Sequence, residues 1–517
     1  MRLGCRQTKR RKGGRARHFP DVRFAQSQSA RELRRHRHQD PELHPTGRAR
    51  GELRPALCRL HALHAGPARP AHRPVELPAP FLGPLEPFDN SFPVLLQEQG
   101  IYSHLVSDHY HYFEDGGWTY HQRYSSFDFI RGQEADKWQA MVRPPLERLR
   151  ERYHPLQIDE DRKGFRLQNL LNREAIREEK DFPAVRCFEQ AIAFLDENRA
   201  HDGWFLQIET FDPHEPFTAP ERFRQDYPTN YAGPILDWPR YREVQESPDE
   251  VAELRANYAA LVAMCDHYVG RLLDYMDEHD LWQDTALVMS TDHGFMLSEH
   301  DWWGKNRMPF YDEIARIPLM IWHPDHAAAA GRHVGALTQC IDLMPTFLEL
   351  YGAPVPAEVQ GRSLLPLLRE DRLHRAAAIY GIFGGATNVT DGRHTYFRYP
   401  RDLFEQEIFE YTLFPVHMTS FFTPAEFEGA TLTRDFDFTK GLPMLRLPAR
   451  RDAKRPPTQG GAFAEAVTAL YDTLTDPGQM RPVQDAAATE RLIALMLDEM
   501  RAHAAPPEAY ARLALAP

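Results

Sequence analysis

The sequence predicts an α/β protein: a central, mostly parallel β-sheet with helices on both faces, plus a smaller C-terminal α+β domain with a short antiparallel sheet. Two observations predict this class. Up to residue 375, apolar runs of strand length alternate with helical periodicity, and beyond it short strand-like runs are separated by Gly and Asp turns. Alternating strands and helices favour a parallel sheet that is covered on both faces.

The predicted strands and helices follow from particular stretches. The stretches that predict buried strands are GWFLQIETF (203–211), TALVMS (285–290) and PLMIWHP (318–324). Residues 250–279 predict a long helix, because apolar side chains recur near one face of it. These are Leu254, Tyr258, Leu261, Cys265, Tyr268, Leu272 and Met276.

The C-terminal part predicts short strands around IYGIF and HTYFRY and then a closing helix near residues 487–503. We therefore divide the chain into three regions: 1–82, a catalytic domain over 83–375 and a C-terminal subdomain over 376–517. The composition of the first region differs most from that of the other two: it has 19 Lys and Arg against 6 Asp and Glu, and it contains no Ile, Tyr, Trp or Asn. A basic arm that binds nucleic acid is one interpretation. A disordered or non-native segment is the interpretation we favour, because nothing aromatic or helical organises the charge.

The overall composition further restricts the classes of protein to which the chain can belong. The chain has 517 residues, 42% of them hydrophobic, with a formal net charge of -12. It contains neither a run of about 18 apolar residues nor an apolar core behind its basic start, so we expect no membrane span, no export signal and a cytoplasmic location. Five Cys without a C-x-x-C pair indicate neither a disulfide framework nor a structural zinc site. The oligomeric state stays open.

The stretch VMSTDHGFMLSEHDWWGK (288–305) places Asp292 and His293 directly behind a predicted strand and Lys305 shortly after it. Functional groups gather past the carboxyl ends of parallel strands. A carboxylate and a neutral imidazole suit a divalent cation, and an ammonium group suits an anionic substrate oxygen. The alternative is structural: Asp292 caps the next helix, and His293 is an ordinary polar residue.

Two further segments contain histidines behind apolar runs. FDPHEPF places His214 between two prolines, where it could protonate a leaving oxygen; exposure without function is the alternative. SDHYHYF (107–113) puts His109 and His111 on one side of a segment that we expect to be extended. Structural and functional interpretations both remain open for this pair.

Taken in order, these segments resemble the sulfatase family of the alkaline phosphatase superfamily. The resemblance covers about residues 83–485. It runs through FDPHEPF, YAALVAMCDHYVGRLLDYMDEHDLWQDTALVMSTDHG, SEHDWWGKNRMPFYDEIARIPLMIW, IDLMPTFLELYG with QGRSLLPLL, and LYDTLTDP. It implies an alkaline phosphatase-like fold and a metal-dependent hydrolase of sulfate esters.

The resemblance also assigns roles to residues. It makes Asp292 and His293 metal ligands, Lys305 a substrate-oxygen lysine and His214 the leaving-group histidine. His109 and His111 fall near the family's Lys-x-His pair, which binds substrate. One divalent metal is implied, Ca first and Mg or Mn as alternatives. The partner is a small-molecule sulfate ester, with no nucleic acid and no membrane.

The sequence departs from the family at its start. The family places an acidic metal ligand on its first strand and a nucleophile in C-x-P-x-R or S-x-P-x-R, whose Cys becomes formylglycine; this chain has neither motif. Reading the codons of residues 1–82 one nucleotide later allows G-S-M-P-C-M-P-A-R over 59–67. In that frame the Cys triplet would straddle Leu63 and His64, and an Asp triplet would straddle Arg23 and Phe24. We hypothesise an out-of-frame translation that rejoins the true frame near Gly83.

Three functions follow from these patterns. The first is a sulfatase-type hydrolase, impaired in this chain by the missing nucleophile. The second is a phosphonate monoester or phosphodiester hydrolase, because Asp-His replaces Asp-Asn at 292–293. The third is an inactive relative that binds an anion or a partner.

Overall fold

The computed structural model describes residues 84–117, 119–158, 164–305, 309–417, 420–449 and 466–516, with the backbone of Cys5–Arg6 and Arg59–His61. The predicted 1–82 region and the frame hypothesis therefore lie outside the described residues, apart from those two stretches. Among the described residues, no helix combines the length and the apolar character needed to cross a bilayer.

The central sheet has six strands in the order β11-β7-β1-β5-β3-β4. Their bounds are β1 (Cys5–Arg6), β3 (Tyr102–Ser107), β4 (Ser126–Phe129), β5 (Trp204–Glu209), β7 (Thr285–Ser290) and β11 (Leu319–Trp322). Strands β4, β3 and β5 are parallel, and β5 and β7 share a direction because both run antiparallel to β1. The mostly parallel sheet is confirmed. The third predicted strand, β11, is an antiparallel edge strand.

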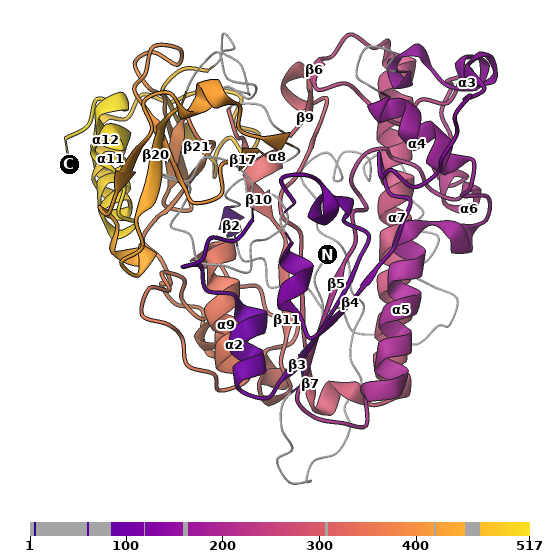
Figure 1. Cartoon of the computed structure of the whole chain (residues 1–517), viewed down its shortest axis with the longest axis horizontal. Coiled ribbons are helices and arrows are strands. Elements are labelled where there is room, and N and C mark those ends of the chain that lie inside the picture. The colour runs from indigo at the N-terminus through magenta and orange to yellow at the C-terminus, as the bar shows by residue number, and fades with distance from the viewer. Residues whose placement is uncertain are drawn as a thin grey trace.

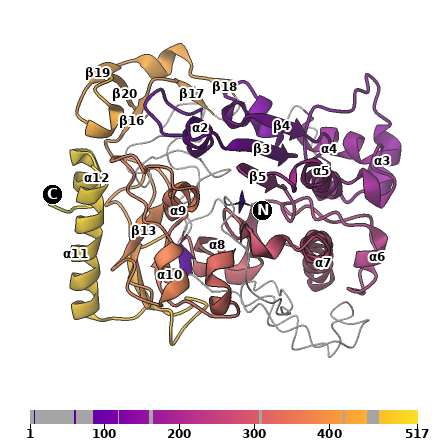
Figure 2. The ribbon, with the colours of Figure 1, turned by 90° about the horizontal axis from the view of Figure 1, so that it is seen from below.

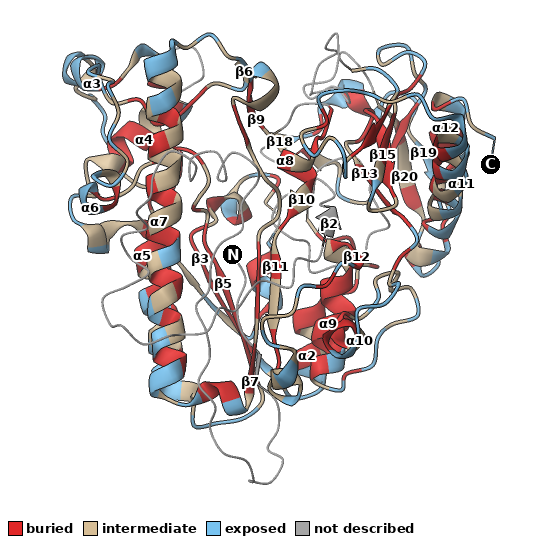
Figure 3. Ribbon diagram, turned by 180° about the vertical axis from the view of Figure 1, so that it is seen from behind, coloured by how far each residue is buried: buried red, intermediate tan, exposed pale blue. Residues whose placement is uncertain are grey.

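Helices cover both faces of this sheet, as predicted (Figures 1 and 2). Helices α5 (Pro183–Asn198) and α7 (Pro248–Glu278) pack together on one face, and α2 (Phe92–Glu98) and α9 (Leu343–Leu350) pack on the other, near α10 (Leu365–Arg369). The long helix α7 begins where Ser247 and Glu250 form a capping box with Pro248 in the first turn. Its buried residues turn toward the sheet, whereas its exposed ones face outward (Figure 3).

Shorter elements surround these layers. The helices are α3 (Leu146–Arg152), α4 (Phe165–Arg173), α6 (Glu221–Arg224) and α8 (Asp312–Ala315). One small sheet contains β6 (Arg242–Glu243), β9 (Trp302–Gly304) and β8 (Met296–Leu297). Another contains β10 (Arg316–Ile317), β2 (Arg59–His61) and β12 (Leu337–Thr338).

The C-terminal part contains the predicted antiparallel sheet. Its strands are β13 (Ala378–Gly381), β14 (Thr387–Thr390), β15 (His394–Arg398) and β21 (Ala469–Asp472). A second sheet holds β16 (Phe409–Thr412), β20 (Met444–Pro448) and β19 (Thr431–Thr433), beside the pair β17 (Val416–His417) and β18 (Ser420–Phe421). The helix expected at 487–503 is α11 (Ala486–Ala502), but it does not close the chain, because α12 (Pro507–Arg512) follows it. The domain boundaries at 83 and 376 stay predictions.

Candidate active site

Three loops leave the same edge of the central sheet. Strands β3, β5 and β7 end at Ser107, Glu209 and Ser290, and the predicted site residues follow each of these ends. Because the three strands share a direction, their carboxyl ends lie on one side of the sheet. The candidate site is therefore assembled by the sheet rather than by neighbouring sequence.

Asp292 and His293 lie in the loop between β7 and β8, so Asp292 caps no helix and that alternative is wrong. The imidazole of His293 donates from Nδ1 to the carbonyl of Gly294 at 2.8 Å, which leaves Nε2 for a ligand. Nε2 lies 3.4 Å from Asp292 Oδ2. Partial burial opposes ionisation of Asp292, but the neighbouring His293 and Lys305 outweigh it and lower the pKa of this carboxyl. The pair thus places one oxygen and one nitrogen close together.

Gly294 fixes this loop against α8. Its N–H donates to the carbonyl of Ile314 at 2.9 Å. A Cβ at this position would overlap the backbone carbonyl oxygen of Glu313 and lie 2.9 Å from its carbon. Glycine is required here because two backbones meet.

His214 and Lys305 are in direct contact. The Nζ of Lys305 donates to Nε2 of His214, and Nδ1 of His214 donates to the carbonyl of Glu215 at 2.6 Å. The side chain of His214 is 19% exposed, so the alternative of an exposed loop histidine is wrong. Burial lowers the pKa of His214 to about 3, and the ring is neutral with its proton on Nδ1. Lys305 therefore carries the proton nearest to Nε2 of this ring.

Lys305 is placed by the residue before it. Gly304 ends β9 with a φ of +121°, and a Cβ there would lie 2.8 Å from the ring of Tyr241. The hydroxyl of Tyr241 in turn donates to the carboxylate of Glu215. The turn after β9 is thus held against the loop that carries His214.

His109 and His111 lie beside the same site, but their segment is not extended as we expected. Residues Tyr110–Phe113 form a short 3-10 helix, with His109 as its N-cap. The ring of His109 lies 4.7 Å from that of Phe211 and 5.1 Å from that of His111. Burial lowers the pKa of His109 well below its usual value; the neighbouring His111 acts in the same direction, whereas the carboxylate of Asp292 opposes it. His111 bonds Glu114 at 2.6 Å.

Sequence reasoning missed two buried glutamates, Glu134 and Glu215. The hydroxyl of Tyr110 donates to Glu134 Oε2 at 2.5 Å. Burial raises the pKa of Glu134 to about 7. Burial also opposes ionisation of Glu215, but its surroundings, including the cation of Lys305, hold its pKa below the usual value. Glu215 stands in the FDPHEPF motif, but Glu134 belongs to no motif and could have been found only from its place behind β4.

Asp108 and Asp212 form a second layer that the sequence also left unassigned. Asp108 is fully buried and accepts from the backbone N–H of Phe211 at 2.7 Å. Asp212 accepts from Gln133 Nε2 at 2.8 Å. Burial raises the pKa of Asp108 well above its usual range and that of Asp212 to about 7. These bonds tie the loops after β3, β4 and β5 together.

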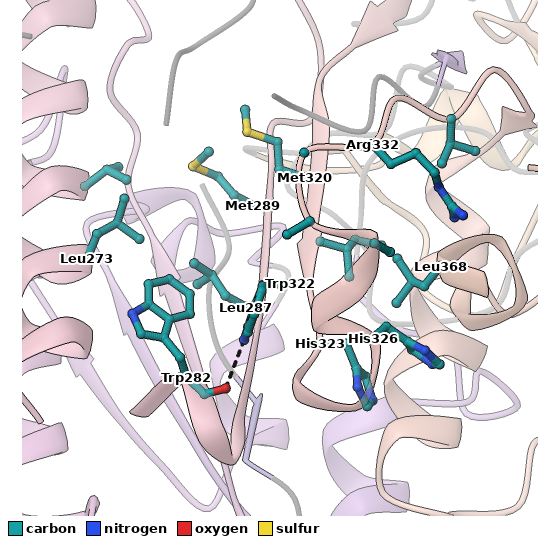
Figure 4. A pocket seen from close by; sticks show the side chains of 16 residues that line it. Leu273, Trp282, Leu287, Met289, Met320, Trp322, His323, His326, Arg332 and Leu368 are labelled. Carbon is teal, nitrogen blue, oxygen red and sulfur yellow. Dashed lines mark hydrogen bonds between the residues drawn. The ribbon is translucent and has the colours of Figure 1, made fainter. Parts of the chain in front are cut away.

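An apolar cavity of about 60 Å³ lies elsewhere, between α7, β7, β11 and the segment that follows β11 (Figure 4). Trp282, Trp322, Met289 and Met320 line it, and Trp322 Nε1 donates to the carbonyl of Trp282 at 3.3 Å. No predicted site residue lines it. Its polar lining residues are His323, His326 and Arg332, which follow β11.

Comparisons with known proteins agree with the resemblance. The sulfatase family profile matches residues 64–353, beginning before the Gly83 at which we placed the start of the likeness. The profile of the C-terminal region of N-sulphoglucosamine sulphohydrolase matches residues 298–413.

Curated relatives share parts of this chain. A multifunctional alkaline phosphatase superfamily protein of Trinickia caryophylli is 29% identical over 224 residues, which are 37% of this chain and 43% of the relative. The N-acetylglucosamine-6-O-sulfatase of Bacteroides thetaiotaomicron is 33% identical over 183 residues, 33% of this chain and 32% of that protein. The mouse iduronate 2-sulfatase is 25% identical over 266 residues, 41% and 48% of the two chains. The matched part spans from a third to about half of these relatives.

Solved structures share the fold over most of the chain. A protein in complex with its substrate D-glucosamine-2-N,6-O-disulfate has a TM-score of 0.55 at 15% identity, covering 87% of this chain and 91% of that one. The phosphonate monoester hydrolase of Agrobacterium radiobacter has a TM-score of 0.52 at 17% identity, covering 85% and 88%. The alkaline phosphatase-like fold is confirmed.

Proposed function

The chain belongs to the sulfatase family, and we propose that it is built as a metal-dependent hydrolase of sulfate esters. The observation that carries the proposal is the meeting of Asp292 and His293 with the His214–Lys305 pair at one edge of the sheet. A cation, an ammonium group and an imidazole in one place are what an anionic ester needs in order to lose its alcohol.

The residues present fit one divalent cation, although incompletely. His293 Nε2 and Asp292 Oδ2 lie 3.4 Å apart, a separation that one ion can bridge. The bond from His293 Nδ1 to Gly294 holds the ring as a metal-binding histidine is usually held. When bound, the metal would neutralise charge on the ester oxygens. Two protein ligands hold a hard cation weakly, so we expect weak binding; Ca is our first choice, with Mg or Mn as alternatives.

The chain's own residues then bind the ester and supply the proton that the departing alcohol needs. Lys305 binds an oxygen of the anionic group, and His109 and His111 border the same space. His214 delivers a proton to the departing alcohol. Its ring is neutral before substrate arrives, but an anion beside it favours the charged ring, and Lys305 donates to the same Nε2. Proton transfer therefore depends on the pair rather than on His214 alone.

The nucleophile motif of the family is absent from this sequence. The sequence has no C-x-P-x-R or S-x-P-x-R motif, so no residue can become the formylglycine of that motif and we derive no attack step. We propose that the chain as written turns over slowly or not at all. Resequencing the gene across residues 1–82 tests the frame hypothesis: a confirmed Arg-rich N-terminus would end it.

A second candidate function keeps the site and changes the ester. His293, where the family usually has Asn, favours a phosphonate monoester or phosphodiester. Paired assays of the frame-corrected chain with an aryl sulfate and an aryl phosphonate separate the two, and the higher kcat/KM decides. The third candidate, an inactive anion-binding relative, is refuted by any turnover that the Lys305→Ala variant abolishes.

A further inference from the structure

A second group of side chains beside Lys305 has the composition of a metal site. Glu134, His214 and Glu215 each offer one ligand atom, and these atoms lie within 4.8 Å of one another. Glu134 is 6% exposed and Glu215 is 2% exposed. The three come from the loops behind β4 and β5, and none of them is part of the Asp292–His293 pair.

The hydrogen bonds around this group resemble those that surround bound metals. His214 donates Nδ1–H to a backbone carbonyl, which leaves Nε2 as the ligand atom. Tyr110 donates to Glu134, and Tyr241 donates to Glu215. Each prospective ligand is thus oriented by a group outside the site, as the ligands of a metal usually are.

Two further observations indicate that the group is made for a cation. Glu215 Oε2 accepts no hydrogen bond among the described residues, although it is buried and lies 3.3 Å from the ring of His214. A buried carboxylate oxygen without a donor is costly unless a positive charge lies near it. The positive charge here is the Lys305 ammonium, which lies 3.9 Å from Glu215 Oε1 and contacts His214 Nε2.

We infer that Glu134, His214 and Glu215 bind a zinc ion in the place of the Lys305 ammonium. Carboxylate oxygens and imidazole nitrogen are zinc ligands, and three of them leave a fourth position open. Zinc here would remove both His214 and Lys305 from the ester. It would therefore inhibit hydrolysis, a consequence that rests on the proposed function, whereas zinc binding itself does not.

The test measures binding rather than turnover. The full chain is titrated with Zn²⁺ by calorimetry and with Co²⁺ by visible absorption, in excess Ca²⁺ so that the Asp292–His293 pair is occupied. Glu134→Gln and Glu215→Gln should each weaken the tightest Zn²⁺ binding by about tenfold or more, since each loses a ligand. The control Glu114→Gln alters the nearby His111 contact and should leave binding unchanged.

Lys305→Met provides an outcome that misfolding cannot imitate. Removing the competing ammonium should strengthen zinc binding by about tenfold or more, because two like charges no longer compete for one place. Equal affinity in Lys305→Met and the parent chain would overturn the inference. So would unchanged binding in Glu134→Gln, or loss of binding in Asp292→Asn. Zinc binding by a frame-corrected chain that shows no esterase activity would refute the proposed function and leave the zinc site standing.

Discussion

Gly294→Ala tests whether the contact between the Asp292–His293 loop and α8 holds the site together. The added Cβ would overlap the carbonyl of Glu313, and because backbone cannot rotate away, the loop must move. The displacement loses the 2.9 Å bond to Ile314, about 0.5–1.5 kcal/mol, and adds overpacking of about 1–3 kcal/mol. We expect a loss of about 1.5–4.5 kcal/mol in the free energy of unfolding.

The assay is urea unfolding with and without Ca²⁺. The variant should unfold at a lower urea concentration, and added Ca²⁺ should stabilise it less than the parent, because Asp292 moves with the loop. Gly270→Ala is the matched control: it lies within α7 with nothing within 4 Å of its Cβ position, so up to about 1 kcal/mol of stabilisation is expected. An unchanged midpoint and an unchanged Ca²⁺ effect in Gly294→Ala would refute the argument.

Three further predictions concern charge and metal. Asp342 is fully buried and bonded to Arg375, and although burial opposes this, the bonds from its neighbours lower its pKa. Asp342→Ala should lower the free energy of unfolding by about 3–5 kcal/mol at pH 7. This deficit should narrow below about pH 4, as the parent's carboxylate gains its proton, and urea unfolding at both pH values measures it. Burial raises the pKa of Glu410 from 4.5 to about 8, so the parent loses stability as the pH rises through that window. Glu410→Gln should therefore raise the free energy of unfolding by at most about 5 kcal/mol at pH 9 and leave it unchanged at pH 4. Equal effects at the two pH values would contradict this prediction. Chelation by EDTA should lower the thermal midpoint of the frame-corrected chain more than that of the present one, since we expect Asp292 and His293 to bind the cation here without the acidic ligand that the corrected frame would add.

The fold could be predicted because its elements have strong periodicities. TALVMS forms β7 with the expected bounds, and the 3.6-residue pattern of α7 survives along the whole helix. The direction of a strand was harder to predict. The antiparallel placement of β11 depends on the path of the chain from Gly294 through α8, and the apolar sequence of the strand itself does not reveal that path. The end of the chain was missed for a related reason: α12 is too short to show a periodicity.

The candidate site was predictable where residue types are chemically unusual for their position. His214, Asp292, His293 and Lys305 stood out because imidazole, carboxylate and amine groups follow buried strands directly. Glu134 did not, because a glutamate in a polar loop is ordinary until the fold buries it beside Glu215. Whether a carboxyl is solvated or forms part of a cation site is decided by its three-dimensional neighbours, and these come from distant parts of the chain.

The pairing of strands at the centre of the sheet is relevant to the N-terminal region, in which the nucleophile motif is missing. Strand β5 pairs with β3 over six residues, but on its other side only Cys5 pairs with Phe205 within the described part of the chain. Strand β7 likewise pairs with β11 over four residues and with Cys5 and Arg6 on its inner side. The place between two parallel strands is therefore held by a two-residue antiparallel strand. A longer parallel strand would satisfy the inner edges of both neighbours and end at the edge where Asp292 and His214 lie. The frame hypothesis, whose Asp triplet straddles Arg23 and Phe24, concerns residues outside the described part of the chain and stays a prediction.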